Sequence, residues 1–114
     1  MNTEELNHVL EGLTCVSSFS FETDRASGVC TLHLELTDDL RRSTRRVKLS
    51  CVNVSNLTLR EWGGGPTQLM CLRIEDLRSR QWDRISYRVV DLEDGRLEFL
   101  CKSIEAVIPD ARTT

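Results

Sequence analysis

One cluster of basic residues lies near a predicted hairpin tip. The cluster consists of Arg41, Arg42, Arg45 and Arg46. Guanidinium groups bind phosphate and carboxylate oxygens in pairs, so such a cluster could hold RNA, a nucleotide or an acidic protein surface. Asp38 and Asp39 neutralise part of the charge, however, and no aromatic side chains interleave with the arginines to stack on bases. A solvent-exposed loop tip is therefore favoured, and a small β-barrel that binds RNA or a nucleotide is the alternative.

A second candidate site combines an aromatic side chain with charges. Trp82 lies within Arg80-Gln81-Trp82-Asp83-Arg84, between two predicted strands, and Trp and Arg are favoured anchors of protein interfaces. Acidic residues follow on the next predicted hairpin, and their charge would complement a basic partner. We therefore predict a partner-binding surface made of Trp82, Asp83, Asp91, Glu93, Asp94 and Glu98. The sequence leaves open whether Trp82 instead plugs one end of the fold.

Catalytic chemistry has little support in the sequence. His8 lies on a predicted helix and His33 in a predicted strand, and neither belongs to a recognisable catalytic signature. The glycines 63–65 are followed by Pro66 and lack the Lys of a phosphate-binding loop, so a flexible loop is favoured there. Trp62 beside them is expected to close a core rather than to anchor a partner. We expect no enzymatic activity and no cofactor.

The five cysteines are odd in number and widely spaced, without a Cys-x-x-Cys pair or a nearby His cluster. This pattern predicts neither a zinc site nor a disulfide framework but buried, reduced thiols, which are typical of a reducing cytoplasm. The amino-terminal residues are acidic and do not form a secretory signal, and no stretch is long and apolar enough to span a membrane. A cytoplasmic location is expected.

The chain has 114 residues, of which 39% are hydrophobic, and a net charge of −3. These values fit one folded domain over residues 1–114 and disfavour a protein that coats nucleic acid. An apolar stripe of Leu6, Val9, Leu10 and Leu13 predicts an amino-terminal helix within residues 1–13, with Thr3 as its cap. Residues 110–114 are expected to form a frayed tail.

Alternating apolar residues predict strands over most of the remaining chain. The predicted strands are 15–22, 29–36, 47–54, 69–76, 84–92, 96–103 and 104–108, and residues 57–59 continue the third run. In the first strand Cys15, Ser17, Phe19 and Phe21 share one side, and a phase slip at 52–54 suggests a bulge or a bend. Residues 77–83 suggest a single helical turn. The fold class is therefore mainly β: a small antiparallel sandwich or partly open barrel of seven or eight strands with a short amino-terminal helix.

The hairpin formed by residues 84–92 and 96–103 has a specific predicted register. A three-residue loop at 93–95 that ends in Gly95 pairs residue 92 with residue 96. Tyr87 then lies opposite Cys101, and Val89 opposite Phe99. A two-residue turn would instead place Asp91 against Glu98 and mix polar with apolar faces, so the longer loop is favoured.

The second half of the chain resembles a loose group of short bacterial proteins, some of which are similar to immunity proteins of polymorphic toxin systems. The resemblance is carried by Val54-Ser55-Asn56-Leu57, Gly63-Gly64-Gly65, Leu72-x-Ile74-Glu75-Asp76, Trp82, Tyr87-x-Val89-x-Asp91 and Phe99-x-Cys101-x-Ser103-Ile104. It implies a non-catalytic, protein-binding inhibitor that shields a toxin or another enzyme. A homodimer joined through sheet edges is a further expectation for the partner.

Overall fold

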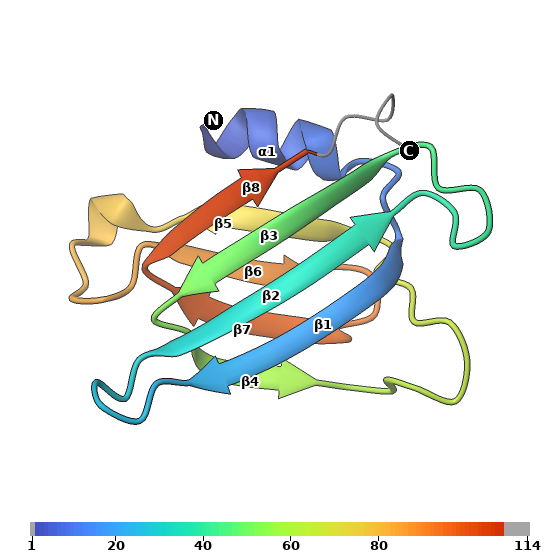
Figure 1. Cartoon of the computed structure of the whole chain (residues 1–114). Coiled ribbons are helices and arrows are strands. Elements are labelled where there is room, and N and C mark those ends of the chain that lie inside the picture. Colours follow the sequence, from blue (N-terminus) through green and yellow to red (C-terminus); the bar gives the residue numbers. More distant parts are fainter. Residues whose placement is uncertain (1, 109–114) are drawn as a thin grey trace.

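The alternating strands of the sequence build two facing sheets in the computed structural model, which describes residues 2–108 (Figure 1). The elements are α1 (Thr3–Leu10), β1 (Cys15–Thr23), β2 (Cys30–Thr37), β3 (Arg46–Val52), β4 (Ser55–Leu59), β5 (Leu72–Asp76), a 3-10 turn (Arg78–Arg80), β6 (Tyr87–Asp91), β7 (Leu97–Cys101) and β8 (Ser103–Val107). Sheet A has the strand order β1-β2-β3-β8 and sheet B the order β4-β7-β6-β5, with antiparallel pairs throughout. The sandwich prediction is confirmed, and the two sheets do not close into a barrel.

The core lies between the sheets and is built by the alternation that the sequence shows. Alternate residues of β2, β3 and β7 are buried, because successive side chains of a strand point to opposite faces. The inward residues include Leu32, Leu34 and Leu36 of β2, Val47, Leu49 and Cys51 of β3, Val89 of β6, and Leu97, Phe99 and Cys101 of β7. The outward residues of the same strands are mostly polar.

The β6–β7 hairpin has the predicted register. Tyr87 pairs with Cys101 and Val89 with Phe99, so the three-residue loop is confirmed. Gly95 adopts the left-handed conformation with φ of 63°, and its N–H donates to the Asp91 carbonyl at 3.0 Å. A glycine tolerates this conformation without a side-chain clash, which explains its place at the end of the loop.

Three local expectations need correction or refinement. The helix cap is Asn2 rather than Thr3, because the Asn2 side chain accepts the Glu5 N–H at 2.7 Å. Ser17 does not share the inner side of β1, since the β1–β2 register shifts there and its hydroxyl donates to Glu35 on the outer face. The phase slip at 52–54 is a bend at which the chain leaves sheet A for sheet B, with Asn53 at φ of 59°. The predicted tail at 110–114 lies outside the described residues.

Two segments close the open sides of the sandwich. Helix α1 lies beside β5, and the Asn7 side chain forms two hydrogen bonds with the Ile74 backbone, at 2.8 and 2.9 Å. These bonds occupy a stretch of the free edge of β5, which would otherwise be open to pairing with another strand. On the opposite side Trp62 packs edge-on against Phe19 with 4.9 Å between ring centroids, and its indole N–H donates to the Arg96 carbonyl. The prediction that Trp62 closes the core is confirmed.

Candidate functional site

The connection between β5 and β6, residues 77–86, projects from one end of sheet B (Figure 1) and is called the anchor loop below. Its two ends are fixed, because the N–H of buried Leu77 donates to the Ser86 carbonyl at 2.7 Å. Between these ends Gln81 and Arg84 hold left-handed φ angles of 53° and 63°. This conformation costs a non-glycine residue about 1 kcal/mol. Strained residues of this kind concentrate at functional sites.

Trp82 lies in the middle of the anchor loop and is 47% exposed. Its ring is covered by the Arg80 guanidinium, which lies 5.1 Å from the ring centroid. The structure thus resolves the alternative that the sequence left open: Trp82 does not plug the sandwich. A large aromatic side chain that is presented to solvent beside a cation has the composition of an interface anchor.

An ion pair fixes the first turn of the anchor loop. The Arg78 guanidinium contacts the Asp76 carboxylate at 2.6 Å and lies 5.8 Å from the centroid of the Tyr87 ring. Hydrogen bonds from the Arg78 side chain and backbone lower the pKa of Asp76. The same pair raises the pKa of Arg78. The contact therefore holds one end of the loop at neutral pH.

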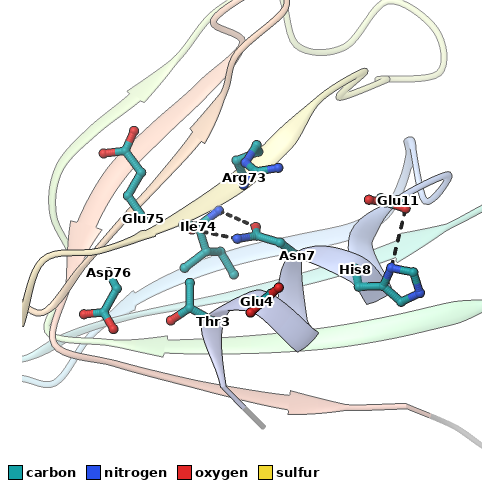
Figure 2. A pocket seen from close by; sticks show the side chains of 9 residues that line it. All are labelled: Thr3, Glu4, Asn7, His8, Glu11, Arg73, Ile74, Glu75 and Asp76. Atoms are coloured by element: carbon teal, nitrogen blue, oxygen red, sulfur yellow. Dashed lines mark hydrogen bonds and ion pairs between the residues drawn. The ribbon is translucent and has the colours of Figure 1, made fainter.

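An open groove of about 740 Å³ lies between α1 and β5, next to the start of the anchor loop (Figure 2). Acidic side chains line both walls, with Glu4 and Glu11 on the helix side and Glu75 and Asp76 on β5. Two of these four carboxylates already have a cation partner, since Asp76 pairs with Arg78 and Glu75 with Arg88. The groove is therefore less acidic in effect than its composition indicates. No motif marked it in the sequence, because it forms only when the helix docks on the strand.

The predicted acidic strip does not form one surface. Trp82 and Asp83 precede β6, whereas Glu93 and Asp94 follow it, so the strand separates the two groups by about 15 Å. Asp91 is only 1% exposed, and its inclusion in an exposed strip is wrong. Its carboxylate instead accepts backbone N–H groups from residues 71, 93 and 96 and holds the hairpin together.

Glu98 lies on the outer face of sheet B, away from both of these groups. It contacts Arg88 at 2.9 Å, and Arg88 also contacts Glu75 at 2.8 Å. These neighbours raise the pKa of Arg88, with the hydrogen bond that it donates to Glu98 as the largest cause. The three side chains form a ladder across β5, β6 and β7, so Arg88 offsets part of the charge of Glu98 and shares that role with Glu75.

Three of the four clustered arginines, Arg41, Arg42 and Arg45, lie in the exposed loop between β2 and β3, where a loop tip was predicted. Arg46 is the first residue of β3 and is half-buried. Asp38 and Asp39 do not neutralise the cluster through ion pairs in the part of the chain that the structure describes. Their carboxylates accept backbone N–H groups of the loop instead. Hydrogen bonds to Asp38, chiefly from the Thr44 hydroxyl, hold the pKa of that carboxyl well below its ordinary value. These aspartates therefore shape the loop that presents the arginines.

The two histidines lie apart from the anchor loop and on open surface. His33 is on the outer face of sheet A, with Nδ1 3.1 Å from the Ser50 hydroxyl and Nε2 3.6 Å from the Glu22 carboxylate. A serine, a histidine and a carboxylate in this order also form the catalytic triad of hydrolases. Ser50, His33 and Glu22, however, lie on a solvent-exposed sheet face, where water is not excluded from a reacting group. His8 faces Glu11 at 3.7 Å on the helix.

Within residues 2–108 all five cysteines are free thiols. Cys15, Cys51 and Cys101 are buried as predicted, whereas Cys30 and Cys71 are half-buried. The same residues contain no group of three or more His, Cys, Asp or Glu side chains that could hold a metal ion. They also contain no helix with the length and apolar character needed to cross a membrane.

Comparison with known proteins identifies the family. A family model described as Immunity protein PIM8 matches residues 4–107, which is nearly the whole chain and extends well beyond the second half that carries the sequence resemblance. No curated protein and no solved structure matches the chain. Such immunity proteins are typically non-catalytic inhibitors, which agrees with the prediction of no enzymatic activity. The chain belongs to the PIM8 immunity protein family.

Proposed function

We propose that this protein binds a cognate toxin directly and inhibits it, with the anchor loop at the centre of the contact. Trp82 is the observation that carries the proposal, because a large apolar side chain is 47% exposed to solvent, with the Arg80 guanidinium against its ring. Binding of a partner would remove this surface from water. Aromatic residues that become buried at an interface dominate the affinity of many complexes. Asp83 lies beside Trp82 and would contact the rim of the same partner.

The acidic residues that were predicted as part of the contact have a lesser role in this proposal. Glu93 and Asp94 lie at the far end of β6, and a partner centred on the anchor loop would reach them only across the outer face of sheet B. Glu98 lies on that face and is already paired with Arg88. We place these residues at the margin of the contact, where charges affect the association rate more than the affinity.

Hydrogen exchange of the complex tests the proposed surface directly. The probe is the protein encoded by the gene next to that of this chain, co-expressed with it and purified as a complex of defined size. Amides of the anchor loop should exchange more slowly in the complex than in the free protein, whereas those of residues 38–45, the loop between β2 and β3 of sheet A, serve as an internal control and should change little. Co-purification without protection of residues 77–86 would refute the surface, and failure to form any complex would refute direct inhibition of that toxin.

A further inference from the structure

Two buried thiols face the same corner of the core from opposite sheets. Cys51 belongs to β3 of sheet A, and Cys101 is the last residue of β7 in sheet B. Both side chains point into the core and are 0% exposed. The chain changes sheets immediately after each cysteine, from β3 to β4 and from β7 to β8.

The backbones approach closely at this corner. The N–H of Lys102, the residue after Cys101, donates to the carbonyl of Val52, the residue after Cys51, at 2.9 Å. Facing sheets are usually about 10 Å apart, whereas a disulfide requires Cα atoms about 4.4–6.8 Å apart. The backbone hydrogen bond brings the two strands closer at this corner than facing strands are at mid-sandwich, and such a close approach is what a disulfide needs.

The two thiols also influence each other. Interaction with the neighbouring Cys101 thiol, followed by burial, raises the pKa of the Cys51 thiol far above its ordinary value. The other cysteines have different surroundings: Cys15 lies near the Thr14 hydroxyl and Cys30 near the Thr23 hydroxyl. Cys51 and Cys101 are thus the pair placed for a cross-link.

We propose that Cys51 and Cys101 form a reversible disulfide that joins the two sheets when the protein meets a low-molecular-weight disulfide such as oxidised glutathione. One cysteine thiolate attacks a sulfur of oxidised glutathione and releases one glutathione, which takes up the proton. The second cysteine then displaces the bound glutathione, so two protein thiols become one disulfide while one oxidised glutathione becomes two reduced molecules. Because both thiols are buried, the reaction requires local opening of the corner and is slow.

Peptide mapping of the wild-type protein tests the proposal without any substitution. The folded protein is incubated with oxidised glutathione and then alkylated in denaturant. Three of the five thiols should remain available for alkylation, and one linked pair of peptides should contain Cys51 and Cys101. Five alkylated thiols, a link that involves another cysteine, or glutathione retained on Cys51 or Cys101 would overturn the proposal.

Thermal unfolding provides a second measurement. The oxidised wild-type protein should melt about 10 °C higher than the reduced protein, because the link restricts the unfolded chain. Cys51→Ala should abolish this increase, whereas Cys15→Ala, which also removes a buried thiol, should retain it. If oxidation still raises the melting temperature of Cys51→Ala, the increase comes from the oxidation of another residue, which would contradict the proposal.

Discussion

The two connections on either side of β5 each carry one of the two tryptophans of the chain, and the two side chains have opposite environments. In residues 60–71 Trp62 is half-buried, packs against Phe19 and donates its indole N–H to the Arg96 carbonyl at 2.6 Å. In the anchor loop Trp82 is 47% exposed and has Arg80 against its ring. The same residue type thus closes the sandwich in one loop and is presented to solvent in the other.

The difference follows from what each loop can reach. Residues 60–71 cross the open side of the sandwich between the edge strands β1 and β4. There the indole contacts an apolar neighbour, Phe19, and donates its N–H to a carbonyl. A buried indole needs such a partner, so this position is stabilising. The anchor loop leaves sheet B at its end, and its left-handed residues, Gln81 and Arg84, direct the chain away from the core. A tryptophan that lies outside the core and is 47% exposed is available for a partner.

Trp62→Ala should have the largest effect on folding. Truncation removes the contact with Phe19 and leaves the open side of the core unfilled, so the free energy of unfolding should fall by about 3 kcal/mol. Urea unfolding followed by circular dichroism measures this loss. Trp82→Ala is the matched control and should change the same quantity by less than about 0.5 kcal/mol. Equal losses in the two variants would remove the distinction between the loops.

Trp82→Ala should have the largest effect on toxin binding. Loss of an exposed aromatic anchor costs about 2 kcal/mol of binding free energy, which is roughly a 30-fold increase in Kd. Calorimetric titration of the co-purified toxin measures this change. Leu92 is 54% exposed at the other end of β6, and Leu92→Ala serves as the control with an expected change of less than about threefold. A larger effect at Leu92 would move the contact to the hairpin end.

Trp62→Phe should separate packing from hydrogen bonding at the closed side. A phenyl ring retains most of the contact with Phe19 but has no N–H, whereas the Arg96 carbonyl still accepts the Arg60 N–H at 3.0 Å. We expect a loss of about 1 kcal/mol in the free energy of unfolding, as for one hydrogen bond. The variant also leaves Trp82 as the sole tryptophan, so its fluorescence should report a solvent-exposed indole. A blue-shifted emission would contradict the exposed position.

The features that the sequence predicted well depend on neighbours along the chain. The β6–β7 register follows from a short loop and from alternation on both sides of it, so Tyr87 and Cys101 could be paired from local pattern alone. The closing role of Trp62 was likewise favoured by its place at a loop edge. Membership of an immunity family could be anticipated because the resemblance rests on short motifs, each of which can be read from neighbouring residues in the second half of the chain.

The features that the sequence could not predict depend on contacts between distant segments. In the sequence Asp91 cannot be distinguished from an exposed acidic residue. In the fold its carboxylate is buried and accepts the backbone N–H groups of residues 71, 93 and 96. The groove between α1 and β5 depends on the contact of Asn7 with the Ile74 backbone, a pair separated by 67 positions. The sequence also does not show that Glu98 is paired, because Arg88 lies beside it only when β6 and β7 form the sheet.

Arg84→Gly should slightly stabilise the free protein. Glycine removes the cost of the left-handed conformation, about 1 kcal/mol, but loses about half of this gain to the greater freedom of the unfolded chain. A net increase of about 0.5 kcal/mol in the free energy of unfolding is expected from urea titration. Arg84→Ala removes the same side chain and retains the strain, so it should show no increase. Stabilisation of both variants would show that the Arg84 side chain, and not its left-handed backbone conformation, destabilises the free protein.

The smallest effect is expected from the ion pair at the start of the anchor loop, and it should depend on pH. The pKa of Asp76 is lowered from 3.8 in the folded protein by the hydrogen bonds from Arg78. The pair therefore contributes stability above about pH 4 and loses it as the pH falls further, because the folded carboxylate must then be protonated. The difference in the free energy of unfolding between wild type and Asp76→Asn should be largest at pH 7 and should shrink below pH 4.

The contributions of the two loops to stability should also differ in their dependence on pH. The contact of Trp62 with the Arg96 carbonyl involves no group that titrates in acid, so the loss in Trp62→Ala should remain the same at pH 7 and pH 3 in a series of urea titrations. A constant difference for Asp76→Asn over this range would mean that Arg78 does not hold the carboxylate in solution. A difference that shrinks for Asp76→Asn alone would show that acid weakens the hold on the anchor loop while the packing of Trp62 keeps its contribution, because that packing depends on no charged group.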